Sequence, residues 1–159
     1  LGTEALVTAW AVGATRKIVA LEGSKAIFSI VDFSLGMIRH GGEEFLAELA
    51  HRIEIKQLEF TEYSQTQEAN VFDVVYLDPM FDKPRGKSIG IQPLRLWAFD
   101  QLLTGETARE AFRLCKRRVV MKEAKGSHWW DELAMEIPSI LTGKSYQSVR
   151  YRILEKESV

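Results

Sequence analysis

The sequence predicts an α/β protein with a mostly parallel sheet that ends in an antiparallel hairpin. Three observations lead to this fold class. Short apolar runs alternate with longer amphipathic ones along the chain, which is typical of strands separated by helices. The run from Asp73 to Leu77 is almost continuously apolar, as expected of a strand covered on both faces. The segment Val149 to Ile153 alternates apolar and charged residues, which indicates one strand of a terminal hairpin.

The first half of the chain is expected to form three helices and two strands. We expect the helices over Thr3–Val12, from Ser24 to Gly41, and over Glu43–Arg52. The middle helix has the clearest signals, because Ser24 suits the N-cap and apolar residues recur at helical spacing at Ile27, Ile30, Val31, Leu35 and Ile38. The expected strands are Lys17–Glu22 and Ile53–Leu58, and polar residues 59–70 are expected to connect them to the next strand.

The second half continues the alternation. Residues Gln92 to Cys115 carry helical spacing with a break at Thr104, and Arg117–Glu123 is expected to be a strand. The last segment, from Ser139 on, is expected to be a hairpin that turns at Thr142-Gly143-Lys144.

Composition favours one globular domain over residues 1–159, with 46% apolar and 27% charged residues. The single cysteine, Cys115, excludes an internal disulfide and a cysteine zinc cluster, and we expect it to be buried on a helix. No segment has the roughly 18 apolar residues that a bilayer span needs, and no acid and histidine cluster suggests a metal. We therefore expect a soluble, cytoplasmic protein.

The charges are unevenly distributed, although the net charge is only −1. From Arg113 to Lys125 six basic residues are accompanied by one acid, Glu123. This pattern is compatible with a local nucleic-acid-binding surface and equally with a solvated helix end.

Acidic residues follow three of the predicted strands. Glu22, Glu59 and Asp78 lie at or just after strand ends, where ligands bind in open parallel sheets. Glu22 precedes Gly23 and a serine, so its carboxylate suits the two hydroxyls of a ribose; the alternative is an acid that caps the next helix. With the turn "LGTEAL" upstream, the spacing favours an adenosine cofactor and does not separate it from a dinucleotide.

The motif "DPMF" discriminates better. Asp78 before Pro79 puts a carboxylate and backbone carbonyls in one rigid place, where they can accept hydrogen bonds from an exocyclic amine. Phe81 offers a face on which a planar base can stack. This arrangement indicates methyl transfer to nitrogen by positioning and electrostatics, from a sulfonium cofactor that needs no metal. The alternative is an ordinary turn with Asp78 as an incidental cap.

These motifs carry a family resemblance. "LGTEAL", "ALEGS", "VVYLDPMF" and "KRRVVMKE" follow in the order of class I S-adenosylmethionine-dependent methyltransferases, and "YLDPMF" resembles the small-subunit ribosomal RNA guanine-N2 methyltransferase J family. The resemblance implies methylation of guanine N2 in ribosomal RNA with S-adenosylmethionine as cofactor. It also implies a first strand before Leu1. A DNA or small-amine acceptor, or a non-catalytic RNA-binding or dinucleotide-binding relative, stays open.

The resemblance also assigns roles to residues. It implies a cofactor loop at Leu1, Gly2 and Thr3, ribose binding at Glu22, an adenine border near Glu59, and a catalytic motif of Asp78, Pro79, Met80 and Phe81. Gly23 and Asp78 are also expected to bind the cofactor. Basic residues are expected to bind the RNA substrate: Lys83, Arg85, Lys87 and Lys122. The loop aromatics either stack on unpaired bases or pack a helix onto the sheet: His128, Trp129 and Trp130.

Overall fold

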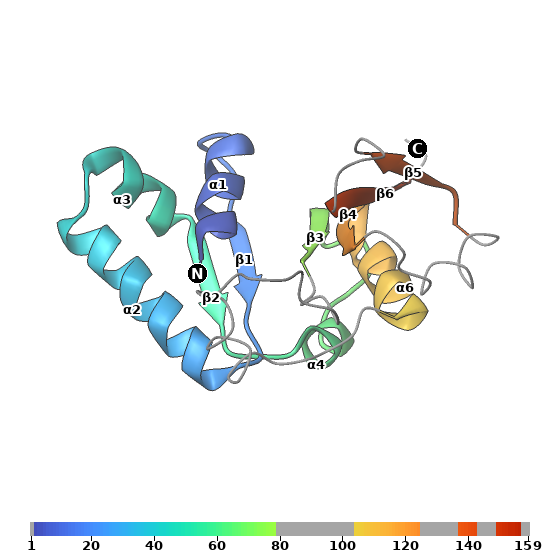
Figure 1. The fold of residues 1–159 in the computed structure, drawn as a ribbon, viewed down its shortest axis with the longest axis horizontal. Coiled ribbons are helices and arrows are strands. Elements are labelled where there is room, and N and C mark those ends of the chain that lie inside the picture. The colour runs from blue at the N-terminus through green and yellow to red at the C-terminus, as the bar shows by residue number, and fades with distance from the viewer. Residues whose placement is uncertain (1, 79–103, 125–136, 143–148, 157–159) are drawn as a thin grey trace. The chain divides into compact units, whose positions relative to one another are not determined.

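The structure is a computed structural model that describes residues 2–78, 104–124, 137–142 and 149–156. The described residues fall into two compact units, the first ending at Phe60 and the second starting at Thr61. Figure 1 shows the elements of both units. The expectation of a single domain over the whole chain stays a prediction.

The first unit pairs two parallel strands with three helices. Its elements are α1 (Thr3–Ala11), β1 (Ile18–Leu21), α2 (Lys25–Gly41), α3 (Glu44–His51) and β2 (Ile53–Lys56). The strands are in register from the pair Ile18 and Ile53 to the pair Leu21 and Lys56. All five elements lie where the sequence predicts them, with small differences at their ends.

Helix α2 supplies much of the core of this unit. Its N-cap, Ser24, accepts a hydrogen bond from the Ile27 backbone N–H at 3.3 Å, as predicted. Its residues Ile27, Val31 and Leu35 are buried in a cluster with residues of α1, α3 and β2: Ala9, Leu49, Ala50 and Ile53. Ile30, which belongs to the predicted apolar stripe, is 42% exposed. The stripe that faces the core is therefore narrower than predicted.

The second unit contains a four-stranded sheet. Its elements are α4 (Phe60–Gln65, which starts at the last residue of the first unit), β3 (Phe72–Leu77), α6 (Gly105–Leu114), β4 (Cys115–Ala124), β5 (Ser139–Thr142) and β6 (Val149–Glu155). Helix α4 corrects the expectation of a plain connection over residues 59–70, because its last turn is closed by bonds among polar residues, such as the 2.9 Å bond from the Ser64 hydroxyl to the Thr61 carbonyl.

The strand order is β3-β4-β6-β5. Strands β3 and β4 are parallel, and β6 is antiparallel to both of its neighbours, β4 and β5. The antiparallel pairing of β5 with β6 confirms the predicted terminal hairpin, but the predicted turn is wrong at Thr142, which is a residue of β5 and pairs with Tyr151. Gly143 and Lys144 of the predicted turn lie outside the described residues. The α/β class and the mostly parallel sheet with a terminal antiparallel pair are thus confirmed.

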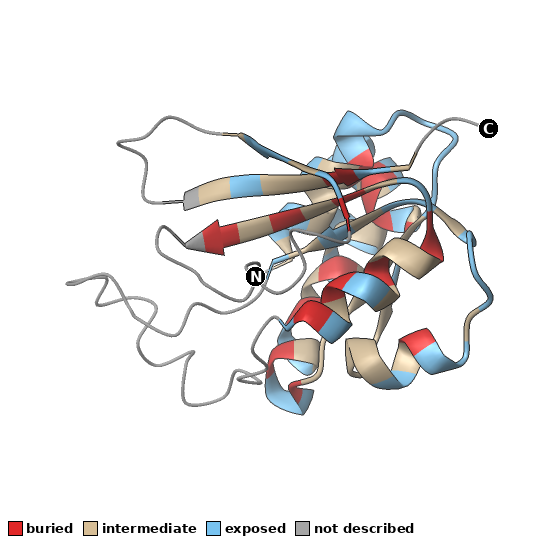
Figure 2. Cartoon of the chain, turned by 90° about the vertical axis from the view of Figure 1, so that its right-hand side faces the viewer, coloured by how far each residue is buried: buried red, intermediate tan, exposed pale blue. Residues whose placement is uncertain are grey.

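The two faces of this sheet differ. On one face Val119, Met121 and Leu154 are fully buried, and helix α6 contacts β3 and β4 (Figure 2). On the other face Val74 is 44% and Tyr76 37% exposed. The expectation that the apolar strand ending at Leu77 is covered on both faces is therefore wrong for the described residues, because the apolar run includes residues of the open face.

Helix α6 continues directly into strand β4. Thr104 is its N-cap and accepts a hydrogen bond from the Thr107 backbone N–H at 3.2 Å, which confirms a helix start at the predicted break; the helical segment predicted before it lies outside the described residues. The backbone becomes extended at Cys115, with φ −82° and ψ 149°, so this cysteine begins β4 and does not lie on the helix. It is buried as expected, and burial raises the pKa of its thiol.

Among the described residues, no helix combines the length and apolar character that a membrane crossing requires.

Candidate functional site

Glu22 lies at the carboxyl end of β1. Its backbone N–H donates to the Lys56 carbonyl at 3.0 Å, and its side-chain Oε1 accepts a hydrogen bond from the Ser24 backbone N–H at 2.8 Å. The second oxygen, Oε2, accepts no hydrogen bond from the described residues. The carboxylate therefore makes the local bond of a helix-capping acid and still has one oxygen open to a ligand hydroxyl.

Glu59 follows the second strand of the first sheet. Its chain position is three residues beyond Lys56, which ends β2 and pairs with Leu21 at the end of β1. Its side chain is partly exposed. Glu22 thus lies at the carboxyl end of β1, and Glu59 follows the carboxyl end of the neighbouring strand, which ends at Lys56, two residues earlier than predicted.

Gly2 has the geometry of a tight turn before a helix. It is the N-cap of α1, with φ +77° and no side-chain capping bond, and Thr3 is the first helical residue. A Cβ at position 2 would lie 2.9 Å from Cγ1 of Val31. Both the positive φ and this close approach require glycine. The first backbone N–H groups of α1 are left without a side-chain cap, as in loops that hold anionic or polar ligands.

Asp78 follows the last residue of β3, and Lys122 of β4 reaches it. The pairing of Leu77 with Met121 sets the next residues of the two strands side by side. Lys122 Nζ lies 2.8 Å from Oδ2 of Asp78, with the two side chains 22% and 27% exposed. The sequence assigned Lys122 to substrate binding, and the structure shows a direct contact with the predicted catalytic acid.

The pair leaves part of the carboxylate open. Asp78 Oδ1 accepts no hydrogen bond from the described residues, whereas Oδ2 is held by a charge-assisted bond. An anionic oxygen held in place at the carboxyl edge of a parallel strand pair can accept a hydrogen bond from an amine or hydroxyl group of a ligand.

The other predicted site residues lie outside the described residues. This holds for Leu1 of the cofactor loop, for the motif residues Pro79, Met80 and Phe81, for the basic residues Lys83, Arg85 and Lys87, and for the aromatics His128, Trp129 and Trp130. Gly23, between Glu22 and the N-cap of α2, is described and partly exposed.

Several basic residues of the stretch from Arg113 to Lys125 are paired with other residues in the described part of the chain. Arg113 donates to the Ser64 and Gln67 carbonyls at 2.7 and 3.0 Å, which ties α6 to the end of α4. Arg118 pairs with Glu155 at 3.3 Å. With Lys122, which contacts Asp78, three of the five described basic residues of this stretch have protein partners, whereas Lys116 and Arg117 are exposed.

One charged cluster was missed by sequence reasoning. Glu123 of β4 is 2% exposed, and Arg152 of β6 donates to both of its oxygens, from Nε to Oε2 at 2.9 Å and from Nη2 to Oε1 at 3.1 Å. Arg150 lies beside them, with Nη2 4.0 Å from Glu123 Oε1. The alternation of residues 149–153 indicated a half-exposed strand, and only the β4–β6 register shows that its arginines share a face with a buried acid.

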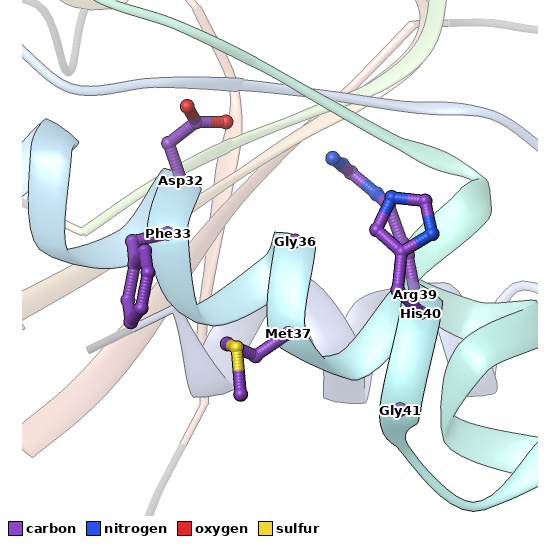
Figure 3. A pocket seen from close by; sticks show the side chains of 7 residues that line it. All are labelled: Asp32, Phe33, Gly36, Met37, Arg39, His40 and Gly41. Atoms are coloured by element: carbon purple, nitrogen blue, oxygen red, sulfur yellow. The ribbon is translucent and has the colours of Figure 1, made fainter.

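A shallow pocket runs along the outer side of α2. Figure 3 shows its lining, which comes entirely from this helix: Asp32, Phe33, Gly36, Met37, Arg39, His40 and Gly41. The Arg39 guanidinium already donates to the Ala50 and Ile53 carbonyls at 3.0 and 2.7 Å. The pocket contains none of the predicted site residues.

Within the described ranges, no group of three or more histidine, cysteine, aspartate or glutamate side chains is placed to hold a metal ion.

Comparisons with known proteins identify the fold of the chain. The chain is 36% identical over 129 residues to the uncharacterized protein YpiP of Bacillus subtilis (strain 168), covering 81% of this chain and 48% of YpiP. The crystal structure of the SAM-dependent methyltransferase NGO1261 from Neisseria gonorrhoeae matches 96% of this chain with a TM-score of 0.60 and 22% identity. The chain has the class I methyltransferase fold.

A second solved structure agrees with this assignment. A candidate rRNA methylase from Clostridium thermocellum matches 98% of this chain and 83% of its own, with a TM-score of 0.59 and 12% identity. The chain spans about half the length of YpiP and 56% of the length of the NGO1261 chain. No known protein-family model matches the sequence.

Proposed function

We propose that the protein is an S-adenosylmethionine-dependent methyltransferase that acts on an exocyclic amine of RNA, in particular guanine N2 in ribosomal RNA. The observation that carries the proposal is the Asp78 carboxylate, which Lys122 holds at the carboxyl end of β3 at 2.8 Å immediately before Pro79, Met80 and Phe81. The methyltransferase fold supplies the context in which this motif has a chemical meaning.

Asp78 orients the acceptor amine in this mechanism. Its open oxygen, Oδ1, accepts a hydrogen bond from an amine N–H, which turns the nitrogen lone pair away from the carboxylate. Lys122 keeps Oδ2 occupied, so the carboxylate presents one oxygen in one direction. When bound, the cofactor supplies an electrophilic methyl group on a positively charged sulfur. In this proposal Asp78 Oδ1 also takes the proton that the amine loses as the new N–C bond forms.

The first unit fits the adenosine part of the cofactor. Glu22 keeps Oε2 open for a ribose hydroxyl while Ser24 holds Oε1, and a carboxylate suits this bond. The Gly2 turn packs against Val31 and starts α1 without a side-chain cap, so the first backbone N–H groups of this helix are available to a polar ligand. We assign Leu1, Gly2 and Thr3 to the cofactor loop, Glu22 and Gly23 to the ribose, and Glu59 to the adenine border.

Two observations support RNA as the substrate. The wording "YLDPMF" resembles a ribosomal RNA guanine-N2 methyltransferase family, and a structure with the same fold is a candidate rRNA methylase. In this proposal Lys83, Arg85 and Lys87, which follow the motif, neutralise phosphates of the bound RNA.

Calorimetry tests the cofactor assignment. The protein should bind S-adenosylmethionine or its demethylated product, S-adenosylhomocysteine, and NAD should not compete. Absence of binding to both compounds would refute a methyltransferase.

Nucleoside analysis tests the acceptor. Mass spectrometry of ribosomal RNA from cells that lack the gene should show a loss of N2-methylguanosine that the restored gene reverses. An unchanged RNA profile with altered DNA methylation would move the acceptor to DNA.

A further inference from the structure

The cluster at the end of β4 contains more positive than negative charge. The β4–β6 register pairs Met121 with Arg152 and Glu123 with Arg150, so the acid and both arginines lie on one face of the sheet. This is the face on which Met121 is fully buried. One buried carboxylate therefore faces two guanidinium groups.

Arg152 already satisfies the carboxylate. It donates to both oxygens of Glu123, at 2.9 and 3.1 Å, and a third bond from its Nη1 to the Ser139 hydroxyl, at 3.1 Å, ties it to β5. A bidentate pair of this kind is the strongest arrangement open to an arginine and a carboxylate. The charge of Arg150 is therefore in excess of what Glu123 needs.

Arg150 lacks hydrogen-bond acceptors in the described part of the chain. Its nearest contact with an acid is the 4.0 Å separation from Glu123 Oε1, which is too long for a hydrogen bond. Its Nε is buried and has no hydrogen-bond partner, while 24% of the side chain is exposed. A guanidinium has five N–H donors and no acceptor atoms, so this group favours an anion with several oxygens.

The position of Arg150 relates it to the acceptor side of the candidate site. Its strand partner, Glu123, follows Lys122 directly, and Lys122 contacts Asp78. Arg150 therefore lies at the same carboxyl edge of the β3–β4 pair as the proposed catalytic acid, but on the opposite face of the sheet, because Lys122 and Glu123 are consecutive strand residues. An RNA strand that presents a base to Asp78 and crosses this edge brings a backbone phosphate to Arg150.

We propose that Arg150 binds a phosphodiester group of the RNA backbone beside the methylated nucleotide. The forked guanidinium matches two phosphate oxygens, and the Glu123–Arg152 pair holds β6 in register while leaving the Arg150 charge unneutralised. The inference rests on the proposed function in naming RNA as the ligand.

The test compares Arg150→Gln with a matched control. Arg118→Gln removes the same charge from the same sheet, but at the other end of β4 and from a residue paired with Glu155 at 3.3 Å. Binding of a small-subunit ribosomal RNA fragment is titrated at several salt concentrations. Arg150→Gln should reduce the slope of log affinity against log salt by about 0.7 to 0.9, the value for one lost phosphate contact, and Arg118→Gln should leave the slope of the wild type.

A second variant guards against a folding defect. Arg150→Lys keeps the charge and loses the fork, so it should keep the salt slope and weaken RNA binding by a similar factor at every salt concentration. If Arg150→Gln unfolds, Arg150→Lys decides, and an RNA affinity equal to that of the wild type would overturn the proposal. An Arg150→Gln variant that folds and retains the wild-type slope would overturn it as well.

Titration with inorganic phosphate tests whether Arg150 binds the RNA backbone or a free anion. Phosphate binding that Arg150→Gln abolishes while the RNA slope stays unchanged would assign the position to a free anion, against the proposal. Calorimetry with S-adenosylmethionine on the same preparations distinguishes a failure of the Arg150 proposal from a failure of the proposed function. A wild type that binds the cofactor and no RNA refutes the role of Arg150 but leaves a methyltransferase with another acceptor, whereas one that binds neither refutes the proposed function itself.

Discussion

At the residue scale, the chemistry of the proposed site depends on a few carboxylate oxygens. Asp78 and Glu22 share one arrangement: one oxygen is held by a group of the protein, and the other accepts no hydrogen bond from the described residues. A carboxylate held on one side presents the remaining oxygen in a defined direction. This arrangement leads to separate predictions for the two acids.

Asp78→Ala should reduce the rate of methyl transfer by on the order of a hundredfold or more, because one fixed acceptor in a preorganised site is lost. The fold should persist, since 27% of the side chain is exposed and its partner Lys122 can reach water. Single-turnover kinetics measures the rate, and Asp73→Ala, at an exposed position of the same strand, is the control. Near-normal methylation by the Asp78 variant would refute its catalytic role.

Glu22→Gln should weaken cofactor binding by about 1.5 to 3 kcal/mol if the charged carboxylate binds ribose hydroxyls. The amide oxygen can still accept the bond from the Ser24 N–H, so the helix cap is preserved and the ribose role is tested alone. Turnover at saturating cofactor should change much less. Calorimetry measures the affinity, and a value equal to that of the wild type would leave Glu22 as a capping residue.

At the element scale, the ends of the helices and strands position these residues. The predictions from sequence were accurate for α1, α2, α3 and β1, because caps and apolar spacing are local signals. Helix α4 was not predicted, since its short polar sequence lacks a helical apolar stripe. The start of β4 at Cys115 was also missed, because nothing in the local pattern marks a helix that passes directly into a strand.

The same distinction between local and long-range signals applies to the candidate site. The acids at strand ends, Glu22, Glu59 and Asp78, were predictable, since a residue after an apolar run must lie at a sheet edge. The contact of Lys122 with Asp78 and the cluster of Glu123 with two arginines were not. Both depend on which strands pair and in which register, and a single sequence does not contain that information.

Replacing two glycines, Gly2 and Gly36, with alanine should change the stability of the protein in opposite directions. Gly2→Ala should destabilise the protein by about 1 kcal/mol or more, because a non-glycine residue is strained at φ +77° and its Cβ would meet Val31. Gly36→Ala, inside α2, meets no atom within 4 Å and should stabilise by up to about 1 kcal/mol through helix propensity. Denaturant unfolding measures both changes. Equal effects of the two substitutions would contradict the turn assigned to Gly2.

At the scale of the whole molecule, the net charge of the chain cannot account for RNA binding. A net charge of −1 gives no general attraction to nucleic acid, so RNA binding must come from particular basic residues. Arg113, Arg118 and Lys122 have protein partners in the described residues. The remaining candidates are the exposed residues Lys116 and Arg117, the basic residues after the catalytic motif, and Arg150.

Replacing Lys83, Arg85 and Lys87 together with alanine should weaken RNA binding and reduce its salt slope by up to about two to three ion equivalents. Cofactor affinity should stay the same, because these residues are assigned to the acceptor. Titrations with RNA at several salt concentrations measure the slope. Parallel lines for the variant and the wild type would show that these residues do not contact the backbone.

The most direct test of the account is the transfer of an isotope-labelled methyl group from S-adenosylmethionine to small-subunit ribosomal RNA, followed by digestion to nucleosides and mass spectrometry. The account predicts label in N2-methylguanosine with the wild-type protein and on the order of a hundredfold less with Asp78→Ala. Absence of label from every nucleoside, or equal labelling by the wild type and the Asp78 variant, would contradict it.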